Sequence, residues 1–487
     1  MRSKLRFLAL LAAVTLIVAA CGGESSSDTT TAADDTPATT AADDAPATTA
    51  ASDAGGDAAA PVDIAFWVAF SDEARLGFAE ERAVEFNAAH PEYNIDVVSF
   101  ASYNDVFDAA VLSVDSGDPP ALIHFFEAAT RQALDAVDSA GNPIFKSVTD
   151  AIDGRTEILG EAVVLDSVVD AARNYYTVDG SFYSMPWNTS SAVMFSNTDI
   201  LDAAGVTEIP DTWDGLEAAC EAIAALPDGP SACMTWPNHG WFVEQSLGQQ
   251  GALLANADNG RTGRATEVFL DSDAMTDYIG WWKDMDDKGH YTYTGAQRDW
   301  DGTANAFYAQ EVAMLVYSSS DATVLTTGGA DAGFNVEASF MPHNGDVDYV
   351  GNLIGGATIW MLDGMDDVTQ DGALAFLNFF SNAANAAEWH KITGYIPITQ
   401  DAVDLLEGEG WYAASPNSLV ASDQLAAAEN TPASLGALLG NFVAIRDVVT
   451  LAIEDILVND LDVAERLALA NEEANKLLTE YEALFGG

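Results

Sequence analysis

The order of hydrophobic segments in residues 61–126 constrains the fold of this chain most strongly. Short apolar or alternating runs at 64–68, 94–100 and 121–126 predict strands. The segments between them, 71–90 and 103–114, repeat apolar residues at helical spacing. Strands that alternate with helices predict a mainly parallel sheet with helices on both faces, which is an α/β fold.

The same order of elements predicts where a ligand binds. In open α/β sheets, ligands lie beyond the carboxyl ends of the strands. Tyr103 follows the second predicted strand and Glu127 follows the third. Ser71 is the expected cap of the first helix, and Pro91 is expected to end it. We therefore expect Tyr103 and Glu127 to lie at one binding edge.

The charge of the chain excludes one class of partner. The sequence has 18 Lys and Arg residues against 76 Asp and Glu residues, a net charge of -58. A protein this acidic repels the phosphates of nucleic acids and of anionic lipids. We therefore expect no nucleic-acid binding, and the acidic surface favours solubility in a saline environment.

The first residues resemble a secretory targeting signal. Arg2, Lys4 and Arg6 precede an apolar run at 8–20, which is too short to span a bilayer comfortably. The following sequence VAACG at 18–22 resembles a bacterial lipobox. We predict a lipoprotein signal peptide at 1–20 and lipidation of Cys21, which would anchor the protein on the outer face of the cytoplasmic membrane. An ordinary signal peptide with a chance cysteine is the alternative.

Residues 24–60 predict a tether. They consist of Ser, Thr, Ala, Asp, Pro and Gly without hydrophobic periodicity, and 31–40 nearly repeats as 40–49. Such a segment cannot bury a core. We therefore divide the chain into a signal peptide at 1–20, a lipid anchor and tether at 21–60, and a globular part from 61 onward.

The segment 388–398 predicts a helix end that holds an aromatic side chain in a fixed place. Gly394 is suited to a left-handed helix stop, and Pro397 prevents further helix. Tyr395 lies between them, either as a binding residue or as a tyrosine that only packs against the core. Two runs rich in Ser and Thr, at 189–191 and 318–320, lie where apolar, strand-like segments end.

The three cysteines allow one disulfide. Cys220 and Cys233 form an even pair once Cys21 is assigned to lipid, and an extracellular setting favours a disulfide, with two buried thiols as the alternative.

No dinucleotide, phosphate-loop, zinc-protease or serine-hydrolase signature is found. The acidic run at 284–289 lacks calcium-loop spacing. We expect no cofactor, no metal and no enzyme activity.

Several separated motifs resemble family 1 extracellular solute-binding proteins, the receptors of ABC importers. PDTWDGL at 210–216 is similar to the family's P-x-T-W-x-x-L helix start, and GGATIW at 355–360 is similar to its crossing strand. Other motifs resemble the branch that binds sn-glycerol 3-phosphate and glycerophosphodiesters; they include Tyr103, Phe126-Glu127, PWNTS at 186–190, the segment 388–397 and LGN at 439–441 leading to Arg446.

The resemblance implies two hinged α/β lobes that trap a small molecule and deliver it to a membrane permease. By this resemblance, lobe one is 61–187 with 318–357, and lobe two is 188–317 with 358–487. The chain would cross between lobes near Asn188, Ser318 and Gly356, and the protein would act as a monomer.

The resemblance also implies a set of ligand-binding residues. The phosphate end would be held by Tyr103, Ser318, Gly356, Tyr395 and Arg446, the glycerol hydroxyls by Glu127 and Ser190, and apolar walls would come from Trp213 and from Trp236 or Trp241. An arginine fork matches phosphate oxygens, and a carboxylate accepts diol hydroxyls. The acidity of the chain disfavours an anionic ligand, so a mono- or oligosaccharide receptor of the same fold is the alternative. A surface enzyme acting on glycans or phosphoesters is the third hypothesis.

Overall fold

The computed structural model describes residues 60–486. The predicted signal peptide, Cys21 and nearly all of the predicted tether lie outside these residues. Within 60–486, no helix combines the length and the apolar character needed to cross a membrane.

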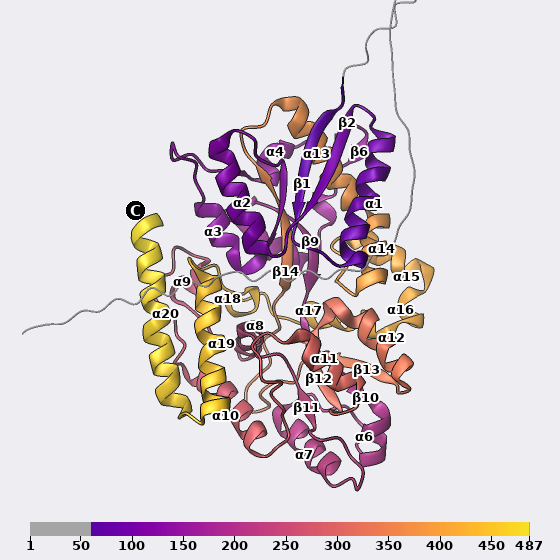
Figure 1. Ribbon diagram of the computed structural model, residues 1–487, viewed down its shortest axis with the longest axis vertical. Coiled ribbons are helices and arrows are strands. Elements are labelled where there is room, and N and C mark those ends of the chain that lie inside the picture. The colour runs from indigo at the N-terminus through magenta and orange to yellow at the C-terminus, as the bar shows by residue number, and fades with distance from the viewer. Residues whose placement is uncertain (1–59, 487) are drawn as a thin grey trace, which may run out of the picture. The chain divides into compact units, whose positions relative to one another are not determined.

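The first sheet contains the strands predicted near the start of the globular part (Figure 1). Its order is β2-β1-β3-β14-β4, and β9 also pairs with β14. The strands are β1 (Val62–Val68), β2 (Tyr93–Ser99), β3 (Leu122–Phe126), β4 (Phe145–Lys146), β9 (Met185–Ser190) and β14 (Gly355–Leu362). The helices of this part are α1 (Glu73–Ala89), α2 (Tyr103–Ser116), α3 (Thr130–Asp135), α4 (Val148–Ile152), α5 (Asp170–Tyr176), α13 (Asp367–Phe380) and α14 (Ala383–Thr393).

The predicted parallel β-α-β-α-β unit is confirmed. β1 pairs in parallel with both β2 and β3. On one face of the sheet, Phe66 contacts Phe376 of α13 at a ring-centroid distance of 5.8 Å. On the other face, Phe107 of α2 stacks on Phe125 at 4.4 Å. Helices therefore cover both faces, as the alternation of elements predicted.

The predicted cap of the first helix was wrong by one residue. Asp72, rather than Ser71, caps α1, because its carboxylate accepts a hydrogen bond from the backbone N–H of Arg75. Both residue types are good caps, so the sequence rule did not separate them. The predicted stop at Gly394 is confirmed: it follows α14 in a left-handed conformation with φ of 105°.

The second sheet has the order β11-β12-β10-β13. β10 pairs antiparallel with both β12 and β13, and only β11 and β12 pair in parallel. The expectation of a mainly parallel sheet therefore does not hold here, nor does it hold for the whole of the first sheet, where β14 pairs antiparallel with β3, β4 and β9. The strands are β10 (Ala192–Asn197), β11 (Met234–Thr235), β12 (Met314–Ser318) and β13 (Val336–Phe340). The helices of this part are α6 (Thr198–Ala204), α7 (Trp213–Ala224), α8 (Gly240–Gln249), α9 (Asn256–Gly260), α10 (Asp273–Asp287), α11 (Trp300–Tyr308) and α12 (Ala322–Ala332).

Two connections between the sheets correct the predicted lobe segments. The chain leaves β9 of the first sheet and enters β10 of the second through Ser191. It returns between β13 and β14, so 336–340 belongs with the second sheet and 355–362 with the first. No crossing occurs at Ser318, because β13 folds back as an antiparallel partner of β10. In β14, likewise, the chain runs antiparallel to β3 and to β9.

The last quarter of the chain is helical. Its helices are α15 (Gln400–Glu409), α16 (Trp411–Ala414), α17 (Val420–Ala426), α18 (Pro432–Leu435), α19 (Phe442–Asn459) and α20 (Val463–Phe485). α19 packs against α20 and α8, and its inner side chains join the core that also holds α7 and α10. Two short hairpins complete the strands, β5 (Glu157–Ile158) with β6 (Glu161–Ala162) and β7 (Thr177–Val178) with β8 (Ser181–Phe182).

Cys220 of α7 and Cys233 form a disulfide in the structure. Both sulfur-bearing side chains are buried in the core of the second sheet. The bond closes the loop between the end of α7 and the start of β11.

Candidate functional site

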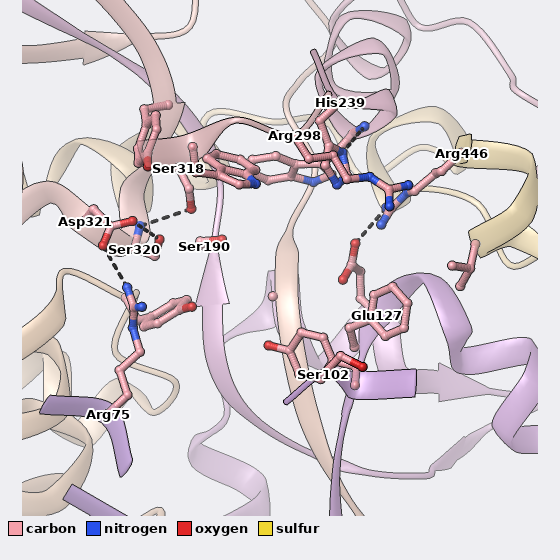
Figure 2. Close-up of a pocket in the computed structure, with 18 of the residues that line it drawn as sticks. Arg75, Ser102, Glu127, Ser190, His239, Arg298, Ser318, Ser320, Asp321 and Arg446 are labelled. Carbon is pink, nitrogen blue, oxygen red and sulfur yellow. Dashed lines mark hydrogen bonds and ion pairs between the residues drawn. The ribbon is translucent and has the colours of Figure 1, made fainter. Parts of the chain in front are cut away.

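A cavity of about 550 Å³ lies between segments of the two sheets. Eight of the nine predicted ligand-binding residues line it: Tyr103, Glu127, Ser190, Trp241, Ser318, Gly356, Tyr395 and Arg446. They come from segments up to 343 positions apart in sequence, yet the fold gathers them around one space (Figure 2).

Strand ends explain why these residues meet. Tyr103 begins α2, directly after β2, and Glu127 begins the short 3-10 helix η1 (Glu127–Ala129), directly after β3. Ser190 ends β9 and Ser318 ends β12. The rule that ligands lie beyond strand ends therefore located Tyr103 and Glu127, whereas Ser190 and Ser318 were expected only from the family resemblance.

Arg446 lies at one side of the cavity and contacts two carboxylates. Its Nη2 donates to Glu127 Oε1 at 2.7 Å and to Glu244 Oε2 at 2.7 Å, and its Nε donates to Glu244 Oε1. The three side chains come from α19, η1 and α8, and each is less than a tenth exposed. Arg446, which was predicted to hold the phosphate, and Glu127, which was predicted to hold the glycerol hydroxyls, thus form an ion pair with each other.

The ion pairs shift the titration of this cluster. Burial would lower the pKa of Arg446, but the carboxylates of Glu244 and Glu127 raise it well above its ordinary value. Burial raises the pKa of Glu244, and Arg446 opposes that rise. Burial also lowers the pKa of His239, which Arg446 and Arg298 lower further. His239 is therefore a neutral ring, and its Nδ1 accepts the backbone N–H of Trp241 at 3.0 Å.

A second ion pair lies at the opposite side of the cavity (Figure 2). Nη2 of Arg75 in α1 donates to Asp321 Oδ1 at 2.7 Å. The Arg75 guanidinium also lies 5.8 Å from the ring centre of Tyr395. Ser318 caps the following turn by accepting the backbone N–H of Ser320 at 3.2 Å. This side of the cavity therefore offers both hydroxyls and charged groups.

Gly356 lies in the floor of the cavity, where β14 approaches β9. Its φ of 104° disfavours any side chain, and a Cβ atom there would lie 1.7 Å from the carbonyl oxygen of Asn188. The Asn188 side chain donates to Tyr103 Oη at 3.1 Å and accepts from His124 Nε2 at 2.7 Å. This network fixes the orientation of the Tyr103 hydroxyl.

Aromatic side chains line part of the cavity. Trp241 and Trp300 lie 6.5 Å apart between ring centres, and Trp300 meets Tyr317 edge to face at 4.9 Å. Trp241 also donates its Nε1–H to the Ile354 carbonyl at 3.5 Å. Rings of this kind pack against the C–H faces of a polyol or sugar.

Trp213 does not line the cavity, so its predicted role as an apolar wall was wrong. It stacks on Trp281 at 5.0 Å inside the core of the second sheet. Trp236 is also a core residue, 1% exposed, and contacts Trp281 and Trp282. Residue type alone did not distinguish a tryptophan of the core from one that lines a cavity.

Sequence reasoning missed several charged residues of the site. Arg75 follows β1, so the rule that located Tyr103 and Glu127 would also have indicated it. Asp321 directly follows the serine run at 318–320, but its partner Arg75 is 246 positions away, so no local pattern indicates the pair. Glu244 and His239 carry no local sequence signal, because their place depends on how α8 packs against α19. Arg298 carries none either, because its partner Asp447 is far away in sequence.

The cavity lining has equal numbers of positive and negative side chains, and two further carboxylates lie behind it. Three arginines (Arg75, Arg298 and Arg446) line it with three carboxylates (Glu127, Asp301 and Asp321). Glu244 and Asp447 stand behind two of these arginines as ion-pair partners. Each of the three arginines therefore already pairs with a carboxylate, and an anionic ligand has to compete with that carboxylate. Among residues 60–486, no group of three or more His, Cys, Asp or Glu side chains is placed to hold a metal ion.

Comparisons with known proteins agree with this fold. The family model for bacterial extracellular solute-binding proteins matches residues 81–437. The sn-glycerol-3-phosphate-binding periplasmic protein UgpB of Pectobacterium atrosepticum is 30% identical over 436 residues, which cover 87% of this chain and 93% of the relative.

Two solved structures share the fold. One is UgpB from Mycobacterium tuberculosis in complex with glycerophosphocholine, with a TM-score of 0.69, 19% identity, and coverage of 86% of this chain and 98% of that one. The other is the cyclic alpha-maltosyl-1,6-maltose binding protein from Arthrobacter globiformis, with a TM-score of 0.68, 20% identity, and coverage of 86% and 100%.

Two α/β parts with a polar cavity between them define a two-lobe binding protein of the periplasmic-binding fold. The chain belongs to the bacterial extracellular solute-binding proteins. It is therefore a solute receptor of an ABC importer and not an enzyme, which confirms the resemblance at the level of the family.

Proposed function

We propose that this receptor binds sn-glycerol 3-phosphate or a glycerophosphodiester in the cavity and delivers it to a membrane permease. The observation that carries the proposal is the meeting of Glu127, Tyr395, Ser318, Gly356 and Arg446 around one space. The similarity to UgpB proteins, whose name states that they bind glycerol 3-phosphate, supports the same ligand class.

In this proposal, the ligand takes the place of one ion-pair partner. A phosphate oxygen would accept from Arg446, whose guanidinium is the strongest donor at that side of the cavity. Glu127 would then turn to accept glycerol hydroxyls. Hydroxyl donors at Ser318 and Tyr395 would orient the rest of the ligand, and the two lobes would close over it by a hinge motion.

A neutral sugar is the second candidate ligand. The two carboxylates on Arg446 compete with an added anion, and Trp241, Trp300 and Tyr317 offer the aromatic surface that sugar rings prefer. The fold is shared with maltose-type receptors, which is compatible with this alternative.

Titration calorimetry tests the two ligand classes. We expect glycerol 3-phosphate or glycerophosphocholine to bind and maltose not to bind. Tyr395→Phe removes one cavity hydroxyl and should weaken binding by about fivefold, because a lost hydrogen bond costs about 1 kcal/mol. Tyr412→Phe is the matched control, since Tyr412 is a buried tyrosine outside the cavity lining. Binding of maltose alone would contradict the phosphate assignment.

We also propose that Cys21 carries the lipid anchor, that 21–60 is the tether, and that the receptor acts as a monomer beside its permease. The lipobox-like sequence at 18–22 supports the anchor. The lobe boundaries that best fit the sheets and cores lie at Ser191, between β13 and β14, and between α14 and α19, because α13 and α14 pack with the first sheet and α19 packs with the second. Mass spectrometry of the native protein tests the anchor, because an unmodified Cys21 or a cleavage site elsewhere would contradict it.

A further inference from the structure

Glu244 accepts hydrogen bonds from the Nε–Nη2 edge of the Arg446 guanidinium, which is an edge that can bind two phosphate oxygens at once. A guanidinium binds an oxyanion most strongly through two parallel N–H donors on one edge. Glu244 accepts from both Nε and Nη2, which form such an edge. Nη2 also donates to Glu127 at 2.7 Å. Among the hydrogen bonds of residues 60–486, none involves Nη1 of Arg446.

The two carboxylates differ in position. Glu127 lines the cavity, whereas Glu244 lies behind Arg446 on α8 and is not part of the lining. A ligand can therefore displace Glu127 without displacing Glu244. Once Glu127 has moved, the ligand meets Arg446 together with Glu244, which is a pair without net charge.

We propose that Glu244 is a specificity-determining residue that weakens the binding of doubly charged phosphomonoesters and favours singly charged phosphodiesters or neutral polyols. The inference rests on the proposed function, because it concerns the ligand of the same cavity. Its physical basis is that the energy of a charge interaction is proportional to the product of the two charges. A fixed negative charge close behind Arg446 repels a dianion about twice as strongly as a monoanion, and it leaves a neutral ligand unaffected.

The substitution Glu244→Gln removes this charge and keeps the shape of the side chain. Glycerol 3-phosphate serves as the dianion, glycerophosphoglycerol as the monoanion and maltose as the neutral probe, all measured by calorimetry at pH 7.5 and fixed ionic strength. We expect Glu244→Gln to tighten the binding of glycerol 3-phosphate by roughly 10- to 100-fold. The gain for glycerophosphoglycerol should be about the square root of that factor, and any maltose affinity should stay unchanged.

The matched control is Glu388→Gln. Glu388 pairs with the buried Arg82 at 2.8 Å, so the same chemical change is made at a buried arginine away from the cavity lining. This control should leave all three affinities unchanged. Equal gains for both anions, or no gain for either, would overturn the role assigned to Glu244. A change in shape alone would not scale with the charge of the ligand.

Failure of the proposed function has a different signature. If the wild-type protein binds neither anion, the glycerol phosphate assignment fails. The role of Glu244 then still stands if the Glu244→Gln variant gains glycerol 3-phosphate binding, and it is overturned if that variant binds no anion either.

A second readout uses the wild-type protein and the Glu127→Gln variant, which both keep Glu244, and covers the case in which Glu244→Gln does not fold. The groups facing Glu244 are Arg446 on α19, Glu127 on η1 and Tyr175 on α5, with His239 and Arg298 flanking Arg446. An anion bound beside Arg446 adds negative charge near Glu244, whose pKa burial already raises, and should cause proton uptake by Glu244. The uptake is measured with glycerophosphoglycerol in two buffers of different ionisation enthalpy. Uptake that persists in Glu127→Gln belongs to Glu244, and its absence there overturns the proposal.

Discussion

Replacing Arg446 by methionine would leave two carboxylates in the interior without their cation. The side chains of Arg446, Glu127 and Glu244 are 6%, 5% and 7% exposed, so water does not compensate for the loss. Removing one member of a buried ion pair costs about 3–5 kcal/mol, because the remaining charge is desolvated and unpaired. Methionine keeps a long apolar stem, which limits the additional loss of packing.

Urea unfolding at pH 7, followed by tryptophan fluorescence, measures this cost. We expect the free energy of unfolding of Arg446→Met to fall by about 3–5 kcal/mol. Arg298→Met is the control: its side chain is 43% exposed where it pairs with Asp447, and an exposed pair contributes about 1 kcal/mol or less. Adding Glu127→Gln and Glu244→Gln to Arg446→Met should restore most of the lost stability.

The pH dependence of the Arg446→Met variant gives an independent check. Burial already raises the pKa of Glu244 above its ordinary value of 4.5, and loss of Arg446 raises it further. The folded state then holds protons that the unfolded state releases, so stability falls as pH rises above that ordinary value. The deficit against wild type should therefore shrink as pH falls toward 4.5. A deficit no larger than that of Arg298→Met, or one independent of pH, would refute the reasoning.

Three further predictions follow from the site. Gly356→Ala should destabilise the fold by more than about 2 kcal/mol in thermal or urea unfolding, because its Cβ would overlap the Asn188 carbonyl; a wild-type midpoint would contradict this. Burial lowers the pKa of His124 from 6.5 to about 3, so between pH 6.5 and pH 3 the folded state binds fewer protons than the unfolded state. The free energy of unfolding should therefore fall as pH drops through that window. A His124 ring signal that titrates near 6.5 by NMR would contradict this. Trp241→Phe should weaken ligand binding several-fold, whereas Trp213→Phe should lower stability and leave affinity unchanged, since only Trp241 lines the cavity; calorimetry and urea unfolding separate the two.

The sequence alone determined the features that depend on near neighbours. The alternation of strands and helices at 61–126 predicted the parallel part of the first sheet, and Gly394 predicted a helix end. Strand ends indicated Tyr103 and Glu127. These predictions succeed because hydrophobic periodicity, capping and the position after a strand are set within a few residues of the chain.

The tertiary structure alone decided which charges meet. Arg446 and Glu244 are 202 positions apart, and Arg75 and Asp321 are 246 apart, so no local pattern connects them. Trp213 and Trp241 have the same side chain, yet one packs in the core and the other faces the cavity. The physical reason is that a salt bridge or an aromatic wall depends on which helices and strands come together, and that choice is made by the packing of the whole core.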